Sequence, residues 1–251
     1  MEPCANCTTP HASAFCPVCG EKRRAPGIRL SEVLHEFIGG LYHAEGPIPS
    51  TLLTFFRGPG KLTRAFIAGK RKSFVPPVRY FLFGVAFYFI IRYLLHWDPV
   101  DAAVQASTGA PPMETPAMRV NHWMSRNVNL LLPILMVMLA TFDRLLFPRT
   151  VLTWVERLVH YLFASGTYLL VSSALLLLTP IWPPIQFVNF FIIFGIIIWA
   201  CIALHRRSAW TVVKAVLMVP ITFVLYVMLS TVLVALALGV PLDQVLMRPG
   251  P

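Results

Sequence analysis

The stretch IQFVNFFIIFGIIIWACIAL, residues 185–204, decides the fold class of this chain. It contains 20 residues and no charged side chain. An α-helix rises about 1.5 Å per residue, so as a helix this stretch would be about 30 Å long, which matches the hydrocarbon core of a bilayer. The sequence therefore predicts a membrane-spanning helix here.

Four further segments are predicted to span a membrane in the same way, over residues 78–97, 128–147, 158–179 and 215–239. The third and fourth of the five spans are separated only by residues 180–184, so we expect them to form an antiparallel hairpin. The chain is 57% apolar and 13% charged, whereas soluble domains are about 45–50% apolar and about 25% charged. This composition excludes a soluble enzyme, a secreted disulfide scaffold and a disordered chain. It favours an all-α integral membrane helical bundle of about five spanning helices.

The distribution of Lys and Arg predicts how the chain is threaded. With the N-terminus inside, the inner segments hold seventeen of these residues and the outer segments hold three, with Arg92 left out because it lies within the first span. Cytoplasmic loops carry the excess of Lys and Arg in membrane proteins. We therefore expect a cytoplasmic N-terminus and an external C-terminus. The net charge of +10 is then explained by loops beside anionic lipid, and no nucleic-acid partner is expected.

Two CxxC pairs near the N-terminus predict a metal site. Cys4 and Cys7 form the first pair, Cys16 and Cys19 form the second, and eight residues separate the pairs. Each CxxC turn directs two thiolates to one centre, and two turns supply the four ligands of tetrahedral Zn²⁺. Redox dithiols and disulfides are the alternatives, but disulfides are rare in the reducing cytoplasm where the orientation places these residues. Four cysteines leave no open coordination position, so the predicted zinc ribbon, residues 1–24, has a structural role.

Two other residues could bear on this site. His11 is a substitute ligand that a Cys4 site does not need. The fifth cysteine, Cys201, lies in the span over residues 185–204, where the sequence favours a small buried apolar role.

A juxtamembrane region, residues 25–77, is predicted to join the ribbon to the membrane bundle, residues 78–251. Its first part has apolar residues at helical spacing, which predicts an amphipathic helix over residues 30–41. Because Glu32 and Glu36 lie on its polar face, we expect this helix to dock onto protein rather than onto anionic lipid.

The second part of the juxtamembrane region, residues 51–72, is apolar and basic, and Gly58-Pro59-Gly60 interrupts it. Its apolar residues are expected to enter the acyl boundary, and its cations to meet lipid phosphates. The former are Phe55, Phe56, Leu62, Phe66 and Ile67. A general anchor is favoured over a specific anion site, and the candidate contacts are Arg64, Lys70 and Arg71. Arg64, nearly alone on an apolar helix, is predicted to make the specific contact, whereas Arg71 is predicted to act only as an anchor.

These motifs together resemble an uncharacterised bacterial membrane family, domain-of-unknown-function family 3667. The matching residues are the four paired cysteines and a Thr-Leu, Pro-Gly, Arg, Gly-Lys-Arg, Pro pattern at Thr51, Leu52, Pro59, Gly60, Arg64, Gly69, Lys70, Arg71 and Pro77. Glu45 stands where an Asp is typical of the family. The resemblance implies a multi-pass protein of the bacterial inner membrane, and it implies no activity, substrate or partner.

Two functions remain open from the sequence. The first is a non-enzymatic membrane protein whose cytoplasmic zinc ribbon docks a protein partner or supports assembly. The second is a lipid-handling protein, a small-solute transporter or a membrane enzyme that binds a phosphate-bearing ligand through the basic segment. Ionisable residues are few within the spans, with Asp143, Arg144 and His160 near the inner ends, and no HExxH, GxSxG or Walker motif occurs. The first function is therefore favoured.

Overall fold

The computed structural model describes residues 2–23, 27–32, 48–96, 116–182, 184–205 and 208–243. Within these ranges, five helices are long and apolar enough to cross a membrane. They are α4 (Pro77–Leu94), α6 (Pro116–Leu146), α7 (Trp154–Leu178), α8 (Ile185–Leu204) and α9 (Ala209–Ala237). The predicted helical bundle with five candidate spans is confirmed. Two short helices, α2 (Ile48–Arg57) and α3 (Pro59–Ile67), precede it, and a two-stranded sheet of β1 (Glu2–Pro3) and β2 (Pro10–His11) lies at the N-terminus.

The helix bounds differ from the predicted spans where polar residues are accommodated inside a helix. The span at residues 185–204 coincides with α8. By contrast, α7 starts at Trp154 because Thr153 and Glu156 form a capping box at its N-terminus. In α9, which starts at Ala209, the Lys214 ammonium donates to the carbonyl of Leu146 at 2.9 Å.

The segment between the first two predicted spans, residues 98–127, is partly helical. Helix α6 begins at Pro116 and continues through this segment into the predicted span. Residues 97–115 lie outside the described residues, as does most of the amphipathic helix predicted over residues 30–41, of which residues 30–32 are helical.

Helix α7 is the centre of the bundle and packs against α4, α6 and α8. A Cβ atom on Gly84 of α4 would lie 3.0 Å from the carbonyl oxygen of Gly166 in α7. Small residues at such a contact let two helix backbones approach closely, which is a common basis of helix packing in membranes. Beside this contact the hydroxyl groups of Tyr80 and Thr167 lie 3.1 Å apart.

Helix α9 packs against α6 and α8 and leaves one long side uncovered. Large apolar side chains are exposed along its whole length, including Val212, Val216, Leu217, Ile221, Val224, Met228, Leu233 and Leu236. A continuous apolar surface of this extent is unfavourable in water and is typical of a helix that faces lipid.

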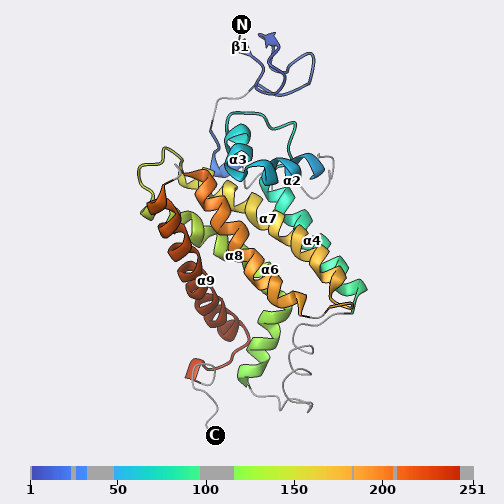
Figure 1. Cartoon of the computed structure of the whole chain (residues 1–251), viewed down its shortest axis with the longest axis vertical. Coiled ribbons are helices and arrows are strands. Elements are labelled where there is room, and N and C mark those ends of the chain that lie inside the picture. Colours follow the sequence, from blue (N-terminus) through green and yellow to red (C-terminus); the bar gives the residue numbers. More distant parts are fainter. Residues whose placement is uncertain are drawn as a thin grey trace.

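Helices α2 and α3 form a cap on one end of the bundle, between the N-terminal ribbon and the helices that follow (Figure 1). Phe55 of α2 packs edge-on against Trp199 of α8, and Phe66 of α3 packs edge-on against Phe163 of α7. Phe55, Leu62 and Phe66 are all buried in protein. The prediction that these three side chains enter the acyl boundary is therefore wrong, because the ends of α7 and α8 supply the apolar surface that they cover.

The backbones of the cap and α8 approach each other closely at Gly60. A Cβ atom there would lie 2.1 Å from the carbonyl oxygen and 2.8 Å from the carbonyl carbon of Ala203, both backbone atoms. Since backbone cannot move aside as a flexible side chain can, only glycine fits at this position.

We expect Gly60→Ala to destabilise the protein by about 1–3 kcal/mol, the usual cost of overpacking. The matched control is Gly195→Ala in α8, where a Cβ atom would meet nothing within 4 Å. This control should be neutral or slightly stabilising, because alanine is the better helix former. Thermal unfolding of both variants in one detergent measures the difference, and equal midpoints would contradict the close contact.

Candidate functional site

The two CxxC segments adopt the same backbone turn. In the first, the N–H of Thr8 donates to the carbonyl of Cys4 at 2.9 Å, and in the second the N–H of Gly20 donates to that of Cys16 at 2.8 Å. The residue after the second cysteine has a positive φ in both turns, 63° at Thr8 and 69° at Gly20. The sequence supplies the favourable glycine only in the second turn.

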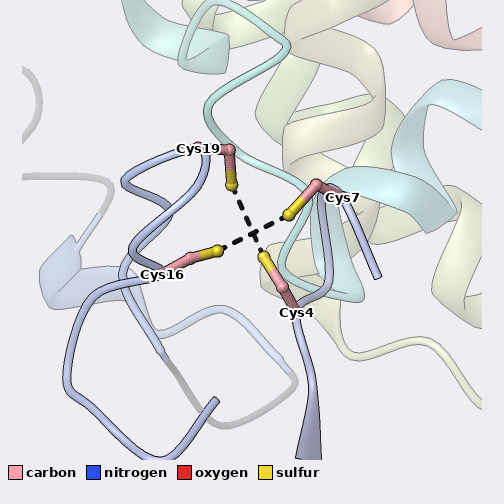
Figure 2. A group of neighbouring side chains, drawn as sticks. All are labelled: Cys4, Cys7, Cys16 and Cys19. Atoms are coloured by element: carbon pink, nitrogen blue, oxygen red, sulfur yellow. Dashed lines mark hydrogen bonds between the residues drawn. The ribbon is translucent and has the colours of Figure 1, made fainter. Parts of the chain in front are cut away.

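The four sulfur atoms converge on one point from these two turns (Figure 2). Cys4 Sγ lies 3.6 Å from Cys19 Sγ, and Cys7 Sγ lies 3.5 Å from Cys16 Sγ. All four lie within 4.8 Å of one another, and none is in a disulfide. With Zn–S bonds of about 2.3 Å, a tetrahedral site has sulfur atoms about 3.8 Å apart. The cluster therefore has nearly the dimensions of a four-thiolate metal site.

The pKa values of the cysteine thiols bear on whether the cluster can bind a cation. Hydrogen bonds with the side chain and backbone of Thr9 lower the pKa of the Cys7 thiol to about 6. The backbone of Glu21 lowers the pKa of the Cys19 thiol, but desolvation and the neighbouring Cys7 and Cys4 outweigh it and raise that pKa to about 11. Adjacent thiolates repel each other, and a bound dication offsets this repulsion.

The ribbon is attached to the cap through Glu21, which follows the second turn. Its carboxylate accepts hydrogen bonds from the backbone N–H groups of Arg71 at 3.1 Å and Lys72 at 2.7 Å. Next to it, the hydroxyl of Ser73 donates to the side-chain oxygen of Asn6 at 2.5 Å. The cysteine cluster and the segment after α3 therefore form one connected unit.

The three predicted anion contacts have different surroundings. Arg64 is exposed, and its guanidinium donates to the carbonyl of Leu204 at the C-terminal end of α8, at 2.6 Å. Arg71 is buried, forms an ion pair with Glu32 at 2.8 Å and donates to the carbonyl of Gly27. Lys70 is half-buried and lines an open pocket between α2 and α3. Both arginines thus bind groups of this chain itself.

A buried polar cluster in the bundle has no counterpart among the predicted site residues. Asp143 of α6 is fully buried, and its Oδ2 accepts a short hydrogen bond from Arg157 of α7. Its Oδ1 accepts from His205 Nε2 at 2.7 Å and from the Tyr161 hydroxyl at 3.1 Å. The Cys201 thiol lies 3.7 Å from the same oxygen, as a weak donor.

Arg157 connects this cluster to the loop between α6 and α7. Its side chain is 1% exposed, and it donates to the carbonyls of Asp143, Phe147, Thr150 and Leu152 as well as to the Asp143 carboxylate. Such complete pairing is what a buried charge requires. Asp143, Cys201 and His205 are close enough to share a metal. However, the Asp143 carboxylate already accepts hydrogen bonds from Arg157, His205 and Tyr161. These contacts connect α6 with α7 and with the C-terminal end of α8.

A second buried histidine links the cap to the bundle. His160 of α7 lies between the hydroxyl of Thr63 in α3, at 2.7 Å from Nδ1, and the carbonyl of Ala200 in α8, at 3.0 Å from Nε2. The sequence signal for both clusters is an ionisable residue inside a predicted span, Asp143 for the first and His160 for the second.

One comparison with known proteins gives a match. Residues 45–89 match the model of a family described as "Protein of unknown function (DUF3667)". The matched segment contains α2, α3 and the first part of α4, together with Arg64, Lys70 and Arg71, and it does not contain the cysteines. No curated protein and no solved structure matches the chain. The comparison supports an uncharacterised family, and the function must be argued from the geometry.

Proposed function

We propose that this chain is a multi-pass protein of the bacterial inner membrane with a docking or assembly role rather than a catalytic one. In this proposal a structural Zn²⁺ held by Cys4, Cys7, Cys16 and Cys19 organises the N-terminal ribbon on the cytoplasmic side. The ribbon fixes the α2–α3 cap, and the ribbon and cap together present a rigid cytoplasmic surface to a protein partner. The proposal rests on one observation above all: Glu21 of the ribbon accepts hydrogen bonds from two backbone N–H groups in the segment that follows α3 of the cap.

The choice of zinc follows from the ligands and their spacing. Four thiolates in a tetrahedral arrangement are typical of structural zinc sites, and they close the coordination shell. A segment of about twenty residues cannot bury enough apolar surface to fold alone, so metal binding supplies the missing free energy. The two-residue strands β1 and β2 are consistent with so small a fold.

The rigidity of the cytoplasmic surface follows from two layers of contact. The ribbon contacts the segment after α3 through Glu21 and Asn6. The cap in turn contacts α7 and α8 through Thr63 and Arg64. These two layers connect the cysteine cluster to the ends of α7 and α8.

The proposed orientation places the ribbon, the cap and the α8 C-terminus on the cytoplasmic side. A reporter enzyme that is active only outside the cytoplasm, fused after Pro251, should be active. The same reporter fused before Met1, or inserted between Arg206 and Arg207, should be silent. Activity of the N-terminal fusion together with silence of the C-terminal one would overturn the orientation.

A further inference from the structure

An open pocket of about 590 Å³ lies between α2 and α3, the two helices of the cap. Ligand-binding pockets are typically about 300–1,000 Å³ in volume. Its polar lining comes from Ser50 and Thr54 of α2, Lys61 of α3, and Lys70 and Ser73 of the following segment, and Phe74 adds an apolar wall. All of these residues lie within residues 45–89, the segment that matches the family.

Two lysines line the pocket, and among the residues that the structure describes no carboxylate lines it. Within the described part of the chain, neither the Lys61 nor the Lys70 ammonium has a hydrogen-bond or ion-pair partner. The nearby Arg64 and Arg71 differ, because their guanidinium groups bind a helix carbonyl and a carboxylate of this chain. Arg64 and Arg71 therefore bind groups of this chain, whereas Lys61 and Lys70 both line one pocket.

The lining groups match the chemistry of a phosphate. The ammonium groups of Lys61 and Lys70 can offset the negative charge of a phosphate. Lysine is a common phosphate ligand in proteins. The Thr54 hydroxyl adds a donor from the opposite helix. The pocket also lies immediately before α4, the first spanning helix, where the head groups of a bilayer would be. The apolar Phe74 side chain can contact the organic group to which the phosphate is attached.

We propose that this pocket binds the phosphate group of an anionic lipid or of a small phosphorylated molecule, and that Lys61 and Lys70 are its principal contacts. Lys70 is among the contacts expected from the sequence, whereas Lys61 is not, and Arg64 and Arg71 do not line this pocket. It goes beyond the assembly role proposed above and does not depend on a metal in the ribbon, so either proposal can fail while the other stands.

The test is native mass spectrometry of the whole chain in micelles with three probes. Phosphatidic acid and phosphatidylcholine with identical acyl chains compare an anionic with a zwitterionic lipid, and glycerol 3-phosphate supplies the same phosphate without acyl chains. The test variant is the double substitution Lys61→Ala/Lys70→Ala. The matched control is Lys72→Ala, which removes one charge from the same basic run at an exposed residue that does not line the pocket.

We expect the double variant to bind the phosphate probe about thirtyfold more weakly, because each lysine beside an anionic group contributes about 1 kcal/mol. Lys72→Ala should bind about as wild type does. If the double variant loses binding of phosphatidic acid selectively, the site is assigned to lipid. If it loses binding of glycerol 3-phosphate, the site is assigned to a free phosphorylated molecule. Equal binding of each probe by wild type and the double variant would overturn the proposal, as would no binding by wild type. The double variant should unfold at the wild-type midpoint, since neither lysine is buried.

Discussion

Replacing Arg157 by methionine is expected to destabilise the folded protein by about 3–5 kcal/mol, the usual cost of breaking a buried ion pair from one side. The substitution leaves the buried Asp143 carboxylate without its cationic partner. It also removes the donor for four backbone carbonyls around the α6–α7 loop. Methionine preserves much of the side-chain volume, so the loss reports on charge and hydrogen bonding rather than on a cavity.

The matched control for this prediction is Arg144→Met, which lies next to Asp143 in the sequence but is exposed. We expect it to change stability by no more than about 0.5 kcal/mol, as surface substitutions usually do. Denaturant titration in micelles, followed by tryptophan fluorescence, compares the two. The double variant Asp143→Asn/Arg157→Met should lose less than the two single variants combined, because it removes both charges. Identical midpoints for Arg157→Met and Arg144→Met would contradict the structural role of the cluster.

Replacing Cys16 by serine is expected to reduce bound zinc from about one ion per chain to nearly none. A hydroxyl is a poor substitute for a thiolate, and three remaining ligands leave the coordination shell open. If the metal stabilises the ribbon as proposed, residues 2–23 should then become sensitive to protease. Elemental analysis of the purified chain measures the metal, and limited proteolysis followed by mass spectrometry measures the loosening.

The fifth cysteine provides the control for this experiment. Cys201 lies in α8, far along the sequence from the ribbon, and is buried beside Asp143. Cys201→Ser should therefore retain the full metal content. A Cys16→Ser variant with full occupancy would show that Cys16 is not a ligand.

The spanning helices could be predicted from the sequence because hydrophobic length is a local property. The segment over residues 185–204 needs no knowledge of its neighbours to be recognised, and it coincides with α8. The ends of the other helices were less predictable. Arg157 and Lys214 lie just before the predicted spans that begin at residues 158 and 215, but partners elsewhere in the chain allow them to lie inside α7 and α9.

The cysteine cluster was equally accessible from sequence, since its ligands lie within sixteen residues and their spacing limits the geometry. The roles of the basic residues could not be predicted from the sequence. Arg64 binds a carbonyl 140 residues away, and Arg71 pairs with a glutamate 39 residues away. A pattern of positive charge beside a membrane predicts lipid contact, and only tertiary structure shows that particular charges are satisfied within the protein.

The burial of the cap residues has the same explanation. Phe55 and Phe66 look like side chains that enter a membrane surface, since lipid and protein are equally good apolar partners for a phenyl ring. Trp199 and Phe163 come from spans far along the chain and cover them instead. The network around Asp143 likewise joins residues 14 and 62 positions apart, a separation at which sequence spacing carries no signal.

The central proposal is that a metal-bound ribbon holds the cap in place. Amide hydrogen exchange at Arg71 and Lys72 tests it most directly, measured in the whole chain before and after zinc is removed with a chelator. Both amides donate to the Glu21 carboxylate, so they should exchange slowly with metal bound and much faster once the ribbon unfolds. Amides in the middle of α7 serve as the internal reference and should not change. Unchanged protection at Arg71 and Lys72 after complete metal removal would contradict the proposal that the ribbon holds the cap in place.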